Sequence, residues 1–414
     1  MPAMDNLVMT SCSSSPASHQ GSIQSLPLEL IREIFLFSTA LKLVRLVDEF
    51  PIPPRFSTTA LALSHVCAHW RFIALSFPEL WASIAVCCPT DHIVRLTKLY
   101  LERSGETTLL DLSLIDVLNN AGPCDEWHAT SAQWERCALD IMSLWIPRAH
   151  RWVGVNLTLR MWGPIPELLH IPPQHLSKLE KASLDFSSWE PCHIQRMWDI
   201  VHTSKALTAV HWHSNLVNYP SLTTFQHITD LYVRTISLEE LASLPSLKHL
   251  VKFAVIGFKE SPDVGVVHLP ALESLSIESL QYDSSWLFDQ IATPSLCDLH
   301  LEQRARMIDV SALHRFLSRT SCPLQRLYIH ASRSSEADLL QYMQLAAPSL
   351  IHLRELALGV DWITELTVNT FTPNDREEIF LPFIKELFLF DCQLEDGLIA
   401  KMVLARASVG KPLA

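Results

Sequence analysis

The chain has 414 residues, of which 48% are hydrophobic and only 18% charged. This length and apolar content suit several domains or one extended repeat array, and the charged fraction is too low for a disordered protein. Its 32 Lys and Arg against 44 Asp and Glu give a net charge of −12, and no basic run occurs, so we expect no nucleic-acid partner. No apolar run approaches the roughly 20 residues that span a bilayer, and we expect no membrane partner.

The N-terminal region combines a serine-rich stretch with a strongly apolar helix. It lacks the basic start and apolar centre of a signal peptide, so we predict a disordered leader over 1–24. A helix is predicted after Leu26 and Pro27, because proline suits the first helical turn, where its missing N–H is not needed. Apolar residues lie on nearly every side of this helix, whereas an amphipathic surface helix has one apolar stripe. We therefore expect its own domain to cover one side and a partner to cover the other.

A second helix is predicted from Thr59 to Ser76, after a proline-containing insert over 41–58 that interrupts regular structure. Its apolar residues recur at i, i+3, i+4, i+7 and i+11, which is the spacing of one helix face. These residues are Leu63, Val66, Cys67, Trp70 and Ala74.

Together the two segments resemble the F-box motif of the fungal type, through "LPLELIREIF" from Leu26 and "LSHVCAHWRFIALSFPELW" from Leu63. The resemblance covers 25–86 and implies binding to a Skp-type adaptor and, through it, to a cullin–RING ubiquitin ligase. It assigns the adaptor contact to Leu26, Pro27, Leu30, Ile31, Ile34 and Phe35, and the motif's own core to Val66, Trp70 and Trp81. The alternative is a helical cap on a repeat array, which such arrays need at their ends.

The rest of the chain repeats the phrase L-x-x-L-x-L nine times, at intervals of 19 to 31 residues. Helical segments such as 309–321 and 336–347 separate several phrases, which predicts parallel strands on one side and helices on the other. The pattern resembles a leucine-rich-repeat solenoid, so the predicted fold class is α/β. We expect irregular helix–strand units over 87–165, the solenoid over 166–405 and a tail over 406–414.

Alternation along each predicted strand places the leucines in the core and the intervening residues on the concave face of the sheet. In the fourth phrase this puts Leu250 in the core and Val251 and Phe253 on the concave face. Aromatic residues and arginine contribute strongly to protein interfaces, so we predict partner contact on this face. The candidate contact residues are His211, Tyr232, Arg234, His300, Arg326, Tyr328 and Phe388.

Motifs for catalysis or cofactor binding are missing from the sequence. The ten glycines are isolated, and no phosphate-binding loop, G-x-S-x-G or H-E-x-x-H motif occurs. His211 and His213 share a predicted strand face, but no third metal ligand can be identified. Asp298 and Glu302 flank His300 without a nucleophile. We therefore expect no enzyme activity, no cofactor and no bound metal.

The ten cysteines are scattered without a C-x-x-C pair, which is typical of reduced thiols and predicts a cytoplasmic or nuclear protein. The sequence favours a substrate-recognition adaptor of a Skp–cullin–F-box type ubiquitin ligase, whose repeats hold an unknown protein substrate. The alternative is a repeat-only binding scaffold that engages no ligase.

Overall fold

The structure is a computed structural model. The predicted leader over 1–24 and all but the last residue of the predicted insert over 41–58 lie outside the residues that it describes. The described residues are 26–40, 58–87, 89–115, 131–159, 163–186, 188–213, 227–258, 265–279, 285–303, 309–320, 322–331, 334–360, 363–373, 379–390 and 392–413.

An N-terminal helical motif comprises α1 (Leu28–Ala40), α2 (Thr59–Val66), α3 (Ala68–Leu75) and the 3-10 turn η2 (Pro78–Trp81). The prediction of one helix over 59–76 is wrong, because Cys67 is extended, with φ −158° and ψ 171°, and divides it in two. The Cys67 thiol accepts the backbone N–H of Trp70 at 3.4 Å and so caps α3. The division turns Val66 outward, where it is 60% exposed, so its predicted place in the motif's core is also wrong.

The core of this motif forms around one side of α1. Ile31 and Phe35 are buried, and the Phe35 ring meets the Trp70 ring edge-on with centroids 5.0 Å apart. Trp81 is also buried, and its indole N–H donates to the Ala74 carbonyl at 2.7 Å. The predicted core positions of Trp70 and Trp81 are confirmed by these contacts.

A ring contact joins the motif to the rest of the chain. Trp81 packs edge-on against Tyr100 of α4 (Asp91–Arg103), with ring centroids 5.0 Å apart. Burial raises the pKa of Tyr100 to about 12, although a hydrogen bond with the Leu61 backbone acts to lower it. Tyr100 therefore contacts both η2 and α2, and it fixes the first helix of the repeat array against the motif.

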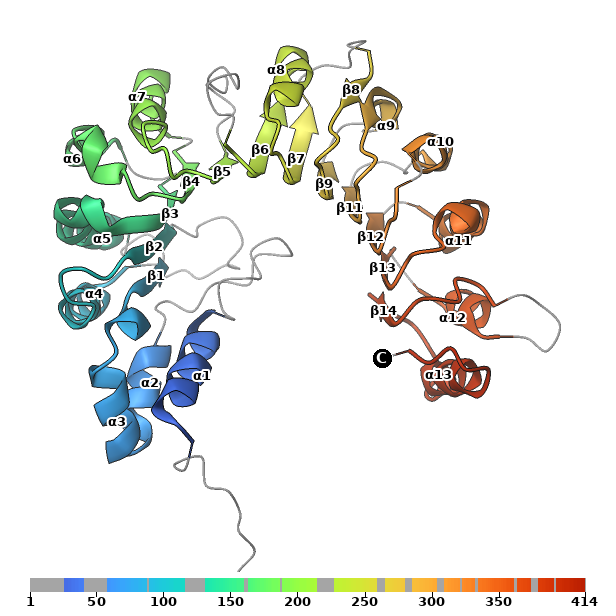
Figure 1. Cartoon of the computed structure of the whole chain (residues 1–414), viewed down its shortest axis with the longest axis horizontal. Helices are drawn as coiled ribbons and strands as arrows, with labels where there is room; N and C mark the ends of the chain where they lie inside the picture. Colours follow the sequence, from blue (N-terminus) through green and yellow to red (C-terminus); the bar gives the residue numbers. More distant parts are fainter. Residues whose placement is uncertain are drawn as a thin grey trace, which may run out of the picture.

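One parallel sheet of twelve strands follows, with its strands in chain order except that β8 and β10 pair separately (Figure 1). The sheet lines the inside of an arch, and the helices cover its outside. Its strands are β1 (Ser83–Cys87), β2 (Leu110–Ile115), β3 (Trp152–Thr158), β4 (Lys181–Asp185), β5 (Ala209–Trp212), β6 (Asp230–Ile236), β7 (Lys252–Phe258), β9 (Ser274–Ser279), β11 (Asp298–Gln303), β12 (Arg326–Ala331), β13 (Glu355–Gly359) and β14 (Glu386–Leu389).

Helices or 3-10 turns lie between most neighbouring strands in the described part of the chain, because parallel pairing requires a crossover after each strand. None of the helices in the described part of the chain has the length and apolarity needed to cross a membrane. The remaining elements are α5 (Ser131–Trp145), η3 (Ile146–Arg151), α6 (Pro166–Leu169), η4 (Pro173–Leu176), α7 (Pro191–Val201), α8 (Leu238–Ser243), η6 (Leu244–Ser246), β8 (Val267–His268), α9 (Ser285–Gln290), β10 (Ile291–Ala292), α10 (Val310–Thr320), α11 (Glu336–Ala346), η7 (Ala347–Ser349), α12 (Glu365–Phe371) and α13 (Leu398–Ser408).

The strand register confirms the predicted core position in every phrase except the fourth. In β7, Phe253 and not Leu250 pairs with Leu231 of β6 and Leu275 of β9. Phe253 is therefore in the core, and Ala254 takes the concave position predicted for Val251. The array also begins earlier than the predicted boundary at 87, because β1 starts at Ser83 and pairs with β2.

The buried side chains form one continuous core between sheet and helices. At the core position of three successive strands, Leu299, Leu327 and Leu356 are no more than 1% exposed. Burying one such leucine contributes roughly 1.5–3 kcal/mol, so the stack of leucines holds neighbouring repeats together. The structure is thus an α/β solenoid with a parallel sheet on its concave side and helices on its convex side, as the leucine pattern predicts.

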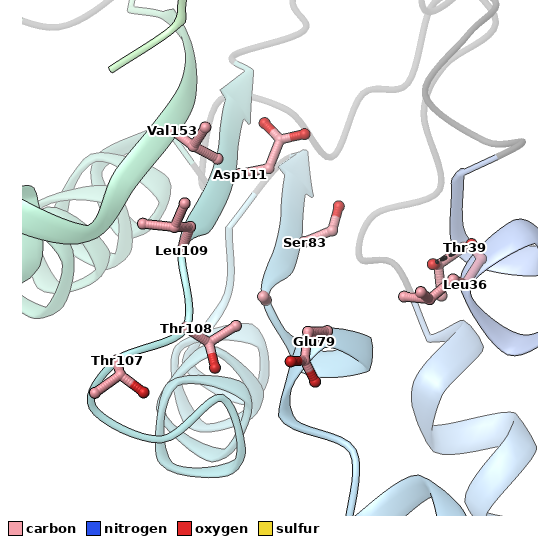
Figure 2. Close-up of a pocket in the computed structure, with 10 residues that line it drawn as sticks. Leu36, Thr39, Glu79, Ser83, Thr107, Thr108, Leu109, Asp111 and Val153 are labelled. Atoms are coloured by element: carbon pink, nitrogen blue, oxygen red, sulfur yellow. Dashed lines mark hydrogen bonds between the residues drawn. The ribbon is translucent and has the colours of Figure 1, made fainter. Parts of the chain in front are cut away.

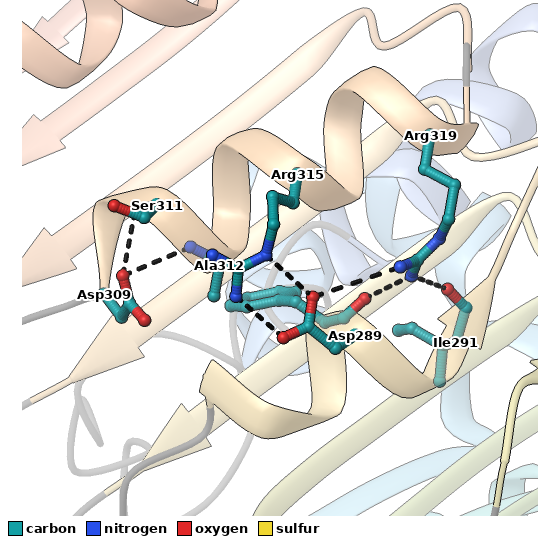
Figure 3. A network of polar contacts seen from close by, with 8 residues as sticks. Asp289, Ile291, Asp309, Ser311, Ala312, Arg315 and Arg319 are labelled. Atoms are coloured by element: carbon teal, nitrogen blue, oxygen red, sulfur yellow. Dashed lines mark hydrogen bonds and ion pairs between the residues drawn. The ribbon is translucent and has the colours of Figure 1, made fainter.

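Polar contacts join neighbouring helices on the convex side (Figure 3). Arg315 of α10 donates two hydrogen bonds to the Asp289 carboxylate of α9, at 3.1 and 2.7 Å, and this contact lowers the pKa of Asp289. Arg319 donates to the carbonyls of Phe288 and Ile291, at the C-terminal end of α9. The two arginines therefore fix α10 against the preceding repeat.

Glu336 makes a similar connection between α11 and α12. Its carboxylate accepts the backbone N–H groups of Thr364 and Thr367, at 2.9 and 3.0 Å, and both hydroxyls. Burial acts to raise the pKa of Glu336, but these hydrogen bonds outweigh burial and hold the pKa below its ordinary value of 4.5. The carboxylate thus caps the N-terminus of the next repeat's helix.

Glu336→Gln is expected to lower the free energy of unfolding by about 1 kcal/mol at neutral pH, as loss of an N-terminal cap does. Because the pKa of Glu336 is lower in the folded state than in the unfolded state, its carboxylate stabilises the fold fully at pH values above the unfolded pKa. This stabilisation is lost as the pH falls through the folded pKa. The difference between wild type and variant should therefore shrink from pH 7 to pH 3 in thermal unfolding followed by circular dichroism. Glu365→Gln, in the exposed first turn of α12, is the control and should behave like wild type. A difference that stays constant with pH would contradict this role.

Candidate functional site

The concave face carries three columns of side chains, one residue from each strand per column. In the central column, His211 lies beside Tyr232, and His300 lies beside Tyr328. Phe388 ends this column on β14, and its side chain is 49% exposed. Arg326 and Arg234 lie in the two flanking columns. All seven predicted contact residues therefore occupy strand positions that alternate with the core.

Aromatic rings gather at two places on this face. In the N-terminal group, Tyr232 packs against His211 and His213, with ring centroids 5.3 and 5.0 Å apart. His213 also lies 3.3 Å from the Ser183 hydroxyl, measured from Nε2 to Oγ. Desolvation by the surrounding protein lowers the pKa of His211, although the charge of Asp230 acts to raise it.

The C-terminal ring group consists of His300, Tyr328 and Phe390. The His300 and Tyr328 ring centroids are 4.0 Å apart, and Tyr328 meets Phe390 edge-on at 5.9 Å. Tyr328 lies on β12, and Phe390 directly follows β14. Their contact therefore passes over β13, which lies between these two strands. The two rings can meet because β13 carries only the small residues Ala357 and Gly359 in these columns.

A ladder of charged residues crosses the face in the column before the core leucines. Lys252 pairs with Asp230 at 3.1 Å, and Arg326 pairs with Asp298 at 3.0 Å, each across adjacent strands. The sequence pattern placed His249 at the position that Lys252 occupies, so the Lys252–Asp230 pair became visible only with the observed register of β7. Asp298 is thus held by an arginine rather than beside a nucleophile.

Potential metal ligands are found at two places. Glu302 and His330 lie 4.0 Å apart on neighbouring strands, measured from Oε1 to Nδ1. Among the described residues, Glu190, Cys192 and His193 at the start of α7 are the three that could share one ion, with their ligand atoms within 4.8 Å. Both Glu190 and Cys192 are exposed on the convex side, so this group is open to solvent.

An open cavity of about 620 Å³ lies between α1 and the first two strands. Figure 2 shows Ser83 of β1 and Asp111 of β2 on one side of the cavity and Leu36 and Thr39 of α1 on the other. Desolvation raises the pKa of Asp111, and the charge of Lys181 acts to lower it. The cavity places a carboxylate where the helical motif meets the concave face.

A second candidate surface lies on α1. Leu30, Ile34 and Phe37 are 50%, 44% and 65% exposed, while Ile31 and Phe35 are buried against the motif. The assignment of Ile31 and Phe35 to a partner contact is therefore wrong in this structure, because their side chains build the motif's core. The four other residues assigned to that contact remain at least partly exposed: Leu26, Pro27, Leu30 and Ile34.

Searches of protein-family models and of curated proteins give no match to this chain. Among solved structures, an internalin from Listeria monocytogenes is 14% identical, over 84% of this chain and 94% of the internalin chain, with a TM-score of 0.33. The fold is accordingly assigned from the strand pairing and burial described above.

Proposed function

We propose that this chain is a substrate-recognition adaptor of a Skp–cullin–F-box type ubiquitin ligase. Its helical motif would bind a Skp-type adaptor, and its concave repeat face would bind a protein substrate. The chain itself would supply no catalytic group. It would accelerate ubiquitin transfer by holding the substrate near the ligase, which raises the effective concentration of the reacting groups.

The observation that carries this proposal is the apolar outer side of α1. The side chains of Leu30, Ile34 and Phe37 are exposed although the opposite side of the helix is fully buried. A contiguous patch of exposed apolar side chains on a protein surface is typical of an interaction site. Its position coincides with the part of the F-box-like motif that the resemblance assigns to the adaptor.

The experiment is co-purification of the full chain with a Skp-type adaptor. Wild type is expected to bind, and Leu30→Asp/Ile34→Asp should weaken binding about 100-fold or more, because two carboxylates would be desolvated in an apolar contact. Both positions are exposed, so the variant should keep the fold and the circular dichroism spectrum of wild type.

Leu404→Asp provides the matched control, since Leu404 is 70% exposed on α13 at the other end of the array. It should bind the adaptor like wild type. If folded wild-type protein does not bind the adaptor, the repeat-only scaffold replaces this proposal. Equal loss of binding in both variants would show that the effect is not specific to α1.

A further inference from the structure

We infer that the C-terminal half of the concave face, β9 and β11–β14, binds an extended, arginine- or lysine-containing segment of a protein partner. This inference rests on the proposed function, because it gives the chemistry of the substrate that the repeats hold. It concerns the opposite end of the array from α1, so the two proposals can fail separately.

Charge is the first observation that supports it. The three concave columns of these five strands carry five carboxylates and one guanidinium, a formal charge of −4 with histidine neutral: Glu278, Asp298, Glu302, Glu355, Glu386 and Arg326. The same columns of β1–β7 carry three carboxylates and three cations, which cancel. Within these columns of described residues, the excess negative charge therefore lies in the C-terminal half of the face.

The charge ladder shows why this half stays negative. Asp230 is paired with Lys252, and Asp298 with Arg326, but the next two strands place Glu355 and Glu386 after Arg326 without another cation. In the part of the chain that the structure describes, neither Glu355 nor Glu386 forms an ion pair. A cationic side chain of a partner would continue the alternation of charge.

Aromatic surface is the second observation. Phe388 and Phe390 are 49% and 42% exposed, and they follow Glu386 at i+2 and i+4 on the same side of the strand. Such spacing sets the three side chains about 6–7 Å apart, which matches alternate residues of an extended peptide. Cations bind over aromatic faces, and a carboxylate close by can accept charge-assisted hydrogen bonds from the same arginine or lysine.

The shape of the face provides space for this segment. Ala357 and Gly359 leave β13 low between Tyr328 on one side and Phe388 on the other. At Gly359 the His330 ring occupies the space that a Cβ would fill, so glycine lets this ring lie close to β13. On β9, Ser276 lies in the central column with 9% of its surface exposed, and its hydroxyl has no hydrogen-bond partner among the described residues.

The test uses the full chain and fluorescein-labelled peptides in which serine alternates with arginine, lysine or glutamate, followed by fluorescence anisotropy. The arginine and lysine peptides are expected to bind and the glutamate peptide is not. Binding should weaken strongly between about 0.1 M and about 1 M salt, where the Debye length falls from roughly 10 to 3 Å. Failure of the arginine peptide to bind, or equal binding of the glutamate peptide, would overturn the inference.

Paired variants locate the site. Phe388→Ala/Glu386→Gln should weaken arginine-peptide binding about tenfold, because one aromatic face and one carboxylate are lost together. His211→Ala/Asp230→Asn removes the same kinds of groups from the N-terminal half and should change affinity less than about twofold. Equal losses in the two variants would mean that the net charge of the chain, rather than this surface, attracts the peptide. Co-purification with the adaptor should be unaffected in both.

Discussion

Arg406→Ala is expected to lower the free energy of unfolding at the C-terminal end by about 3 kcal/mol, because two buried carbonyls and one partly buried carbonyl lose a charged donor. The Arg406 side chain is fully buried in α13 and donates to the carbonyls of Phe371, Phe380 and Leu381 at 3.3, 3.2 and 3.0 Å. Leu381 has a φ of 45°, in the left-handed region that non-glycine residues rarely occupy. Arg406 therefore also holds a strained residue in place.

Hydrogen exchange measured by mass spectrometry provides the test for Arg406. In Arg406→Ala, amides of α12, β14 and α13 should exchange faster, while those of β2–β7 keep their protection, because a repeat contacts only its neighbours. Arg406→Lys should recover only part of the loss, since an ammonium lacks the planar fork that reaches several carbonyls. Lys401→Ala, at an exposed position of the same helix, is the control. Unchanged exchange in Arg406→Ala would contradict the role of the buried guanidinium.

Trp81→Ala is expected to cost about 3–5 kcal/mol, the usual range for removing a buried tryptophan. The change removes the contact with Tyr100 and leaves the Ala74 carbonyl without its indole donor. We expect α1–α3 to lose protection against hydrogen exchange while β9–β14 remain as in wild type. Trp81→Phe keeps most of the ring contact and should cost about 1–2 kcal/mol, mainly for the lost hydrogen bond.

Under the proposed function, Trp81→Ala should also reduce co-purification with a Skp-type adaptor, although Trp81 is buried and offers no surface to a partner. The reason is that α1 would no longer be held in its folded position. The arginine peptide should still bind normally, because its site lies on β9–β14. Loss of protection throughout the array would show that the motif and the repeats unfold as one unit.

The sequence predicted the architecture well because the solenoid repeats one signal, an apolar residue, most often leucine, at the same place in successive strands. It failed in the fourth phrase because Leu247, Leu250 and Phe253 are spaced by three, so the L-x-x-L step alone fits two registers. The observed register makes the two steps around Phe253 equal at 22 residues, from Leu231 to Phe253 and from Phe253 to Leu275. An even repeat length was the signal that could have decided between them.

Other features depend on contacts that periodicity does not contain. The break at Cys67 has no glycine or proline to mark it, and a thiol is an uncommon helix cap. The all-round apolar pattern of α1 could not show that Ile31 and Phe35 face inward while Leu30 and Ile34 face outward. A single arginine such as Arg406 resembles a surface residue until the carbonyls around it are known.

The arch also fixes a distance. Its twelve strands lie about 4.8 Å apart, so the concave arc from β1 to β14 is roughly 50 Å long, and α1 and β14 lie toward opposite ends of it. Under the proposed function, a substrate held on β13 would present other lysines to the attached ligase than the same substrate held on β4. The number of repeats between the two ends would then decide which lysine is modified, without any change in the residues that make contact.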